Sequence, residues 1–306
     1  MEPWRDWSGL LPELLAEISI RIPSTEDFMA FRGVCSPWRA AASKDKFVNS
    51  CHAIPLLMLP EKRHGRSDER EFYSLSRRKI AMRLPLPEAK GEVNLLNPFS
   101  RSLIHLPNLT KFPVPECYRC TSVQKAVFSA NPCHTPDFVL MVIHSLSLRL
   151  GFWRPGNSSW TAIALHTNDG FMDVNYCNGK FYAIDSEGKV CVWDESAPDL
   201  EVVHLLFRID DAQLFVPFRY TYLVQSSEGE LLLVSCWVAD PYPNGIQEIA
   251  NVKVIQLDVA RHKWKRITSL GEDAVFFRNG AAFCIQGSTF PDLIKAQLRL
   301  SGIGEV

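Results

Sequence analysis

The chain has 306 residues, of which 46% are hydrophobic and 22% are charged. These ordinary proportions exclude disorder over the whole length, because there is enough apolar side chain to build a core. The 33 basic and 34 acidic residues nearly cancel, which argues against a dedicated nucleic-acid-binding protein with a basic face. At roughly 150 residues per domain, the length predicts about two domains.

The first residues lack the pattern of a targeting or membrane segment. Acidic residues stand where a secretory signal would be basic, and Glu13 and Glu17 interrupt the apolar stretch that follows. The apolar run at residues 138–143 is far shorter than the ~18–20 residues that span a bilayer. We therefore expect no membrane partner and a cytoplasmic or nuclear location, with the nine cysteines present as reduced thiols.

The first fifty residues predict three short helices. Pro12 suits the first turn of the first helix, where its missing N–H costs nothing. A second helix is expected after Ser24, with Asp27 as its capping-box partner, and a third from Ser36. Three short helices bury very little apolar surface, so such a module commonly depends on contacts with a partner for its stability. Apolar residues of the first helix repeat at helical spacing: Leu11, Leu14, Leu15, Ile18 and Ile22.

From about residue 51, short strand-forming runs alternate with turn residues. Two strand pairs, residues 181–193 and 222–234, each contain a Ser-Glu-Gly turn, and the two turns are offset by 41 residues. The same shift backwards reaches a third pair at 138–153. A period near 40 is the spacing of four-stranded propeller blades, and residues 51–306 would hold roughly six. An irregular β-sandwich is the alternative.

Two further segments place a turn ahead of a strand. Residues 257–264 resemble residues 96–103 at an offset of 161 residues, or about four periods of 40. Residues 154–160 have the same form but fall outside this register. The repeat is therefore expected to be degenerate.

The helical segment carries a specific pattern: Leu11-Pro12-Glu13-Leu14-Leu15, then Asp27, then Phe31-Arg32-Gly33-Val34-Cys35-Ser36-Pro37-Trp38-Arg39. This pattern resembles the F-box. It departs mildly from the usual F-box sequence at Ile18-Ser19-Ile20, a change that keeps the apolar face.

Segments 178–185, 229–234 and 269–277 carry a second resemblance. Through these segments, residues 51–306 look like the kelch-like propeller domain of unknown function that follows the F-box in many plant proteins. The expected fold is mainly β with a small α N-terminal module. An F-box helical domain at 1–50 would precede a degenerate kelch-like β-propeller at 51–306, which would recognise the substrate.

The resemblance implies a substrate-recognition adaptor of an SCF-type cullin–RING ubiquitin ligase, a non-catalytic subunit without a cofactor. The F-box would dock onto the small adaptor subunit and through it reach the cullin, while the propeller binds an unknown target protein. An apolar ridge on so small a module supports an interface. Leu11, Pro12 and Leu15 are expected mainly at the interface. The full set of expected adaptor-binding residues is Leu11, Pro12, Leu14, Leu15, Ile18, Phe31, Val34, Cys35, Trp38 and Arg39.

The rival interpretation is a stand-alone β-propeller that binds proteins or acts as a hydrolase. The sequence has no nucleophile elbow, no H-E-x-x-H motif and no phosphate-binding glycine loop. Asp169 with Asp173, and Asp185 with Asp194, are candidate carboxylate pairs, but turn and strand-end roles explain such residues better. Blade cores are the expected place of Trp153, Trp160, Trp193, Trp237 and Trp264, with a ligand groove as the alternative.

Two clusters suggest other ligands. Cys117 and Cys120, followed by Cys133-His134, resemble a zinc finger, but adjacent residues make an awkward second chelating pair, so no metal is expected. The basic stretches 62–66 and 77–79 are separated by acidic residues, which favours a solvated loop over a nucleic-acid site.

The C-terminal segment departs from the family pattern. A further strand pair is expected after Phe290-Pro291, yet residues 293–298 have helical spacing. We therefore expect an incompletely closed propeller, with a mobile or helical tail after about residue 290 and one bare blade edge.

Overall fold

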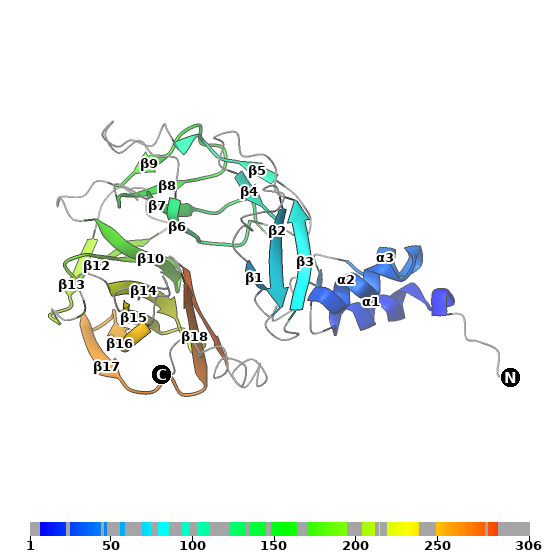
Figure 1. Cartoon of the computed structure of the whole chain (residues 1–306). Helices are drawn as coiled ribbons and strands as arrows, with labels where there is room; N and C mark the ends of the chain where they lie inside the picture. The colour runs from blue at the N-terminus through cyan, green and yellow to red at the C-terminus, as the bar shows by residue number, and fades with distance from the viewer. Residues whose placement is uncertain are drawn as a thin grey trace, which may run out of the picture. The chain divides into compact units, whose positions relative to one another are not determined.

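The chain divides into two compact units, residues 1–90 with 95–104, and residues 91–94 with 105–306. The first unit holds both helices and strands, so the expected domain boundary at residue 50 stays a prediction. The computed structural model (Figure 1) describes residues 7–22, 25–43, 46–47, 56–58, 69–74, 79–85, 94–97, 103–109, 123–132, 135–144, 148–163, 170–194, 204–211, 214, 219–238, 249–278 and 281–286.

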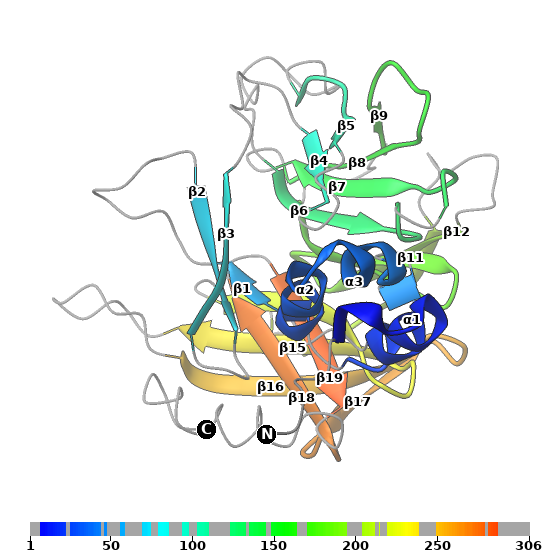
Figure 2. The same ribbon diagram turned by 90° about the vertical axis from the view of Figure 1, so that its right-hand side faces the viewer.

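The three predicted N-terminal helices are confirmed (Figure 2). Pro12 and Pro37 occupy the first turns of α1 and α3, where a missing N–H leaves no helical hydrogen bond unmade. The expected cap Ser24 lies outside the described residues. The elements are the 3-10 turn η1 (Trp7–Gly9) and the helices α1 (Pro12–Ile20), α2 (Thr25–Gly33) and α3 (Ser36–Ala41).

The core of this helical module is small. Its buried side chains are those of Leu15, Phe28, Phe31, Ala42 and Phe47. The rings of Phe28 and Phe47 stack with their centroids 3.9 Å apart. With about 1.5–3 kcal/mol for each fully buried large side chain, so few contributors leave the module marginal without further contacts.

The first strands form an antiparallel sheet in the order β1-β2-β3. A register shift interrupts the β2–β3 pairing between Phe72 and Tyr73. A separate two-stranded sheet joins β4 to β5. The bounds are β1 (Leu56–Met58), β2 (Glu69–Ser74), β3 (Lys79–Pro85), β4 (Asn94–Leu96) and β5 (Leu103–His105).

Three consecutive four-stranded antiparallel meanders follow, each with its strands in chain order, which is the form of a propeller blade. A two-stranded sheet of β18 and β19 comes after them. Figure 2 shows β15 and β16 side by side in the third blade. The first blade comprises β6 (Val123–Phe128), β7 (Leu140–His144), β8 (Leu150–Trp153) and β9 (Thr161–Ala162). The second comprises β10 (Phe171–Cys177), β11 (Lys180–Asp185), β12 (Lys189–Asp194) and β13 (His204–Arg208). The third comprises β14 (Arg219–Gln225), β15 (Leu231–Val238), β16 (Ile249–Asp258) and β17 (Lys263–Ile267), and the last sheet comprises β18 (Asp273–Arg278) and β19 (Ala281–Gln286).

The predicted period near 40 is wrong, although the predicted strand pairs exist. First strands begin at Val123, Phe171, Arg219 and Asp273, so the spacing is 48, 48 and 54 residues. The turn at 185–188 joins the second and third strands of its blade, whereas the turn at 226–229 joins the first and second. The sequence predicts that residues 154–160 fall outside the register. In the structure they join the third strand of their blade, β8, to the fourth, β9. The turn before Lys263 likewise joins the third strand of its blade, β16, to the fourth, β17. The longer spacing favours about five repeats between residues 51 and 306 rather than six.

The first strand of each blade packs against the first strand of the next. β10 lies against both β6 and β14, and β14 also contacts β19. One buried cluster joins the first blade to the second and includes Met141, Phe171 and Trp193. Another joins the second blade to the third and includes Ile184 and Leu233. The expected fold class, mainly β with a small helical module, is confirmed, while the tail at 292–300 lies outside the described residues.

Candidate functional site

Helix α1 presents an apolar stripe to solvent. Leu11 is 62% exposed, Leu14 is 50% exposed and Ile18 is 45% exposed. Their spacing of three and four residues places them on one face of the helix. Large apolar side chains gathered in this way on a small module mark a surface that a partner can cover.

Other exposed apolar side chains lie elsewhere in the module. Val34, just after α2, is 59% exposed. Two further exposed residues, Trp7 at 60% and Met29 at 46%, were missed by sequence reasoning. Met29 directly follows the buried Phe28, so its position off the inner face of α2 was the signal that could have found it.

The expectation that Leu15 belongs to the exposed ridge is wrong. Its side chain is 0% exposed and packs in the core with Phe28 and Phe31. Leu15 therefore supports the outer stripe from beneath. Phe31 has a similar place, since it is 9% exposed and its ring lies 4.5 Å from that of the half-buried Trp38.

Polar contacts tie the helices of the module together. Arg32 donates through Nη1 to the carbonyl oxygens of Arg39 and Ala42, and Arg39 Nε donates to Arg32 O at 3.2 Å. Trp38 Nε1 donates to Trp7 O at 3.0 Å. The arginine bonds connect the end of α2 with α3, and the Trp38 bond holds η1 against α3. These contacts hold the helices around the apolar core of the module.

The ten predicted adaptor-binding residues divide by exposure. The buried members, Leu15 and Phe31, form the core. Cys35, which precedes α3 as a free thiol, and Trp38 are half-buried. The exposed members are Leu11, Pro12, Leu14, Ile18, Val34 and Arg39.

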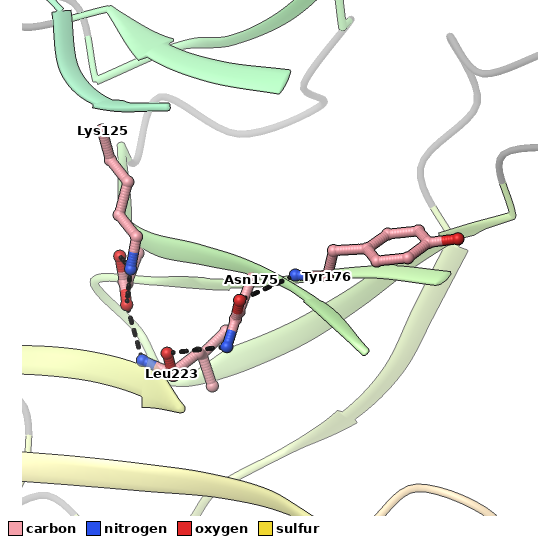
Figure 3. A network of polar contacts seen from close by, with 5 residues as sticks. Lys125, Asn175, Tyr176 and Leu223 are labelled. Carbon is pink, nitrogen blue, oxygen red and sulfur yellow. Dashed lines mark hydrogen bonds and ion pairs between the residues drawn. The ribbon is translucent and has the colours of Figure 1, made fainter. Parts of the chain in front are cut away.

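In the described part of the propeller, a buried charged contact joins three blades (Figure 3). Asp173 of β10 accepts from Lys125 Nζ of β6, with N–O distances of 2.6 and 2.8 Å. Its Oδ2 also accepts from the backbone N–H of Leu223 in β14 at 2.6 Å. Asn175 Nδ2 donates to Leu223 O at 3.1 Å. This network ties together the inner strands of neighbouring blades.

Burial raises the pKa of Asp173 to about 6, against the opposing effects of Lys125 and the Leu223 N–H. Asp173 as a whole residue is 1% exposed. Asp173 is therefore fully engaged within the protein, with little surface for a substrate to reach. A structural role follows from this geometry.

The other candidate carboxylates serve turns and strand ends. Asp185 Oδ1 accepts from the backbone N–H groups of Glu187 and Lys189, at 2.9 and 2.8 Å. This confirms the predicted turn role of Asp185. Asp194 at the end of β12 lies 3.6 Å from Lys180 Nζ. The expected partner Asp169 lies outside the described residues.

The tryptophans follow the blade-core prediction where their side chains are described. Trp153, Trp160 and Trp193 are 4%, 3% and 1% exposed. Trp264 is half-buried and packs against the core between the second and third blades. Trp237 has no described side chain, so its prediction stays open.

One hollow, of about 360 Å³, is lined by Asn94, His105, Leu106 and Asn108. His105 Nδ1 and Asn94 Oδ1 lie 2.8 Å apart. Within this described lining there is no carboxylate, hydroxyl or thiol side chain.

Cys117, Cys120, Cys133 and His134, where no metal is expected, lie outside the described residues, as do the basic residues 62–66. In the part of the chain that is described, no group of three or more metal-ligating side chains comes together. Among the described helices, none combines the length and the hydropathy that crossing a bilayer requires.

A family model described as KIB1-4 beta-propeller matches residues 47–297. The chain belongs to the KIB1-4 beta-propeller family. The match covers all the described strands, including the three complete blades. It agrees with the expected propeller.

Relatives of this KIB1-4 beta-propeller chain come from Arabidopsis thaliana. F-box protein SKIP23 is 26% identical, and the match covers 92% of this chain and 80% of the relative. F-box protein At2g26160 is 24% identical, and the match covers 93% of this chain and 92% of the relative. Putative F-box/kelch-repeat protein At5g24040 is 25% identical, and the match covers 93% of this chain and 84% of the relative. The expected resemblance to plant F-box proteins with a propeller domain is confirmed.

Solved structures give more distant matches. The structure of YCF48 bound to D1 peptide is 11% identical at a TM-score of 0.38, and the match covers 67% of this chain and 65% of that one. A streptogramin B lyase structure is 8% identical at a TM-score of 0.34, with 66% of each chain covered. In both cases this chain spans slightly less than two thirds of the other's length.

Proposed function

We propose that this chain is a substrate-recognition adaptor of an SCF-type cullin–RING ubiquitin ligase, acting in the cytoplasm or nucleus. The observation that carries the proposal is the exposed stripe of Leu11, Leu14 and Ile18 on α1. The relatives named F-box proteins support the same assignment. The helical module would dock through this stripe onto the adaptor subunit and so connect the propeller to the cullin.

The energetics of the stripe favour a protein partner. Each large apolar side chain transferred from water to an interface contributes about 1.5–3 kcal/mol. Anchors of this kind commonly cost about 2 kcal/mol or more when they are truncated. Because Leu15 holds α1 onto the module core, the outer residues can bind without rearrangement of the helix.

In this proposal the propeller holds the target protein and the chain itself is not a catalyst. Asp173 and Asp185 are both engaged by internal donors, which leaves neither poised as a general acid or base. Ubiquitin transfer would then require the remaining ligase subunits. The rival, a stand-alone propeller that binds proteins or hydrolyses a substrate, has no need of the α1 stripe.

The test is co-purification of the tagged full chain with the purified adaptor subunit. The variant Leu14→Asp/Ile18→Asp places two charges in the stripe without touching the core, and it should abolish retention of the adaptor subunit. Leu205→Asp is the matched control, because Leu205 is 58% exposed but lies on β13 of the propeller. Equal retention by wild type and by Leu14→Asp/Ile18→Asp would overturn the proposal and favour the stand-alone propeller.

A further inference from the structure

The outermost strand of the third blade carries an unusual concentration of positive charge. Residues 261–266 read Arg-His-Lys-Trp-Lys-Arg, so four of six side chains are permanently cationic at neutral pH. The chain as a whole is almost neutral, with a formal charge of −1. The charge is therefore local to β17 and the turn that precedes it.

The cations of β17 face solvent on both sides of the strand. Lys263 and Lys265 share one face by strand alternation, and Arg266 lies on the other face with Trp264. All three cations are exposed, and Trp264 anchors the strand by packing against the core. Positive charge thus flanks the strand edge from above and below.

These cations lack partners within the described part of the chain. Arg261 pairs with Asp258 at 3.0 Å. By contrast, no described carboxylate lies within 4 Å of the charged groups of Lys263, Lys265 or Arg266. Within the described part of the chain, their charge is therefore left for an external anion.

The backbone of β17 offers a second means of recognition. Among the described strands, β17 pairs with β16 alone and ends its sheet. Figure 1 shows β17 on the outer rim of this blade. An unpaired strand edge presents alternating N–H and C=O groups, which can pair with an extended peptide.

Positive charge on an edge strand also serves to prevent unwanted pairing between sheets. The outermost strands of the other two complete blades carry less positive charge. β9 (Thr161–Ala162) has no charged residue, and β13 (His204–Arg208) has one arginine. The charge on β17 exceeds what its neighbours use for protection. This difference points to a ligand.

We propose that the edge of β17 binds an extended acidic segment of a partner protein by strand addition. Backbone hydrogen bonds would hold the segment against β17, and aspartate or glutamate side chains would meet Lys263, Lys265 and Arg266. A peptide fits better than a nucleic acid, because an extended peptide can pair with both the N–H and the C=O groups of the edge at the spacing of a strand. The proposal rests on the proposed role of the propeller in holding a target and names the chemistry of that target.

The test uses the purified full chain and a fluorescent peptide of about ten residues that alternates glutamate with threonine, a length that spans one strand. Fluorescence anisotropy should detect binding that weakens as salt rises from about 50 to 300 mM. The variant Lys263→Gln/Lys265→Gln should bind about tenfold more weakly. The control Arg154→Gln/Lys180→Gln removes the same charge from the first and second blades and should bind like wild type.

Two further probes separate the alternatives. A peptide with glutamine in place of glutamate, and an acidic peptide N-methylated at alternate residues, should both lose binding. The proposal is overturned if Lys263→Gln/Lys265→Gln binds like wild type, if either altered peptide binds equally well, if single-stranded oligo-dT binds as tightly, or if no binding occurs. A purely protective role predicts unchanged peptide binding and new self-association of the variant. The titration contains no ligase subunit, so its failure is distinguishable from failure of the adaptor contact.

Discussion

Lys125 Nζ lies 2.6 Å from Asp173 Oδ1 and 2.8 Å from Oδ2, although the two residues belong to different blades. Their side chains are only 9% and 2% exposed. Asp173 also accepts the N–H of Leu223 from a third blade. One carboxylate thus couples the positions of β6, β10 and β14. Removing either charge should weaken the contact between blades more than a surface ion pair would.

Lys125→Met should destabilise the chain by about 3–5 kcal/mol, because it leaves the buried Asp173 carboxylate without its cation. The measurement is the free energy of unfolding in urea, monitored by tryptophan fluorescence. The double variant Lys125→Met/Asp173→Asn should be more stable than Lys125→Met alone, because asparagine is neutral and keeps an acceptor for the Leu223 N–H. A double variant as unstable as the sum of the two single variants would contradict this coupling.

The stability of the chain should also depend on the ionisation of Asp173. Its pKa is about 6 in the folded chain, against 3.8 as the ordinary value. The folded state therefore binds the proton more tightly, and the stability linked to Asp173 rises as pH falls through 6 and is lost as pH rises again. Between pH 7 and pH 5, wild type should gain about 1 kcal/mol relative to Asp173→Asn, which cannot titrate there.

Urea unfolding of both proteins at pH 7 and pH 5 measures this difference. Taking the difference in stability between wild type and Asp173→Asn cancels the contributions of the other titrating groups, because the two chains are otherwise identical. A loss of wild-type stability relative to Asp173→Asn on acidification would mean that the attraction of Lys125 outweighs burial, and it would refute the predicted direction.

The strand pairs could be predicted from the sequence, but their places within the blades could not. Gly188 and Gly229 both end turns with positive φ, of 82° and 84°, and their N–H groups bond to Asp185 O and Ser226 O. The same local turn therefore closes hairpins at two different positions in a blade. Turn chemistry depends on a few neighbouring residues, whereas the position of a strand depends on distant contacts such as Asp173 with Leu223.

A similar limit applies to the helical stripe. Helical spacing placed Leu14 and Leu15 on one apolar face, yet Leu14 is 50% exposed and Leu15 is 0% exposed. Adjacent residues on a helix point about 100° apart, so a broad apolar face divides between the core and solvent. Which part turns inward depends on Phe28 and Phe47, which lie on other segments.

Leu15→Ala and Leu14→Ala should separate these two roles. Leu15→Ala leaves a cavity in the module core and should cost about 2–5 kcal/mol of its stability. Leu14→Ala removes an exposed side chain and should change stability by less than about 0.5 kcal/mol, while it weakens adaptor binding. Hydrogen exchange of the α1 amides measures the first effect, and co-purification measures the second. Equal protection of α1 in both variants would contradict the assignment of Leu15 to the core.

Gly170, just before β10, should not tolerate alanine. A Cβ there would lie 2.2 Å from Leu148 Cβ and 2.7 Å from Leu148 Cδ1. The two segments cannot easily separate, because Phe171 N donates to Leu148 O at 2.9 Å. Gly170→Ala should therefore destabilise the chain by about 1–3 kcal/mol in urea unfolding. Gly33→Ala is the matched control, since a Cβ there meets nothing within 4 Å.

Leu148→Gly provides a sharper check on the cause. Leu148 has φ of 49°, a conformation that glycine adopts without strain, so this change removes the obstructing side chain without opposing the backbone. Leu148→Gly alone should still cost stability, because Leu148 packs against the core between the first and second blades. In that background, Gly170→Ala should cost almost nothing further. If Gly170→Ala remains as harmful without the Leu148 side chain, the close approach of these two residues is not the reason that glycine is needed before β10.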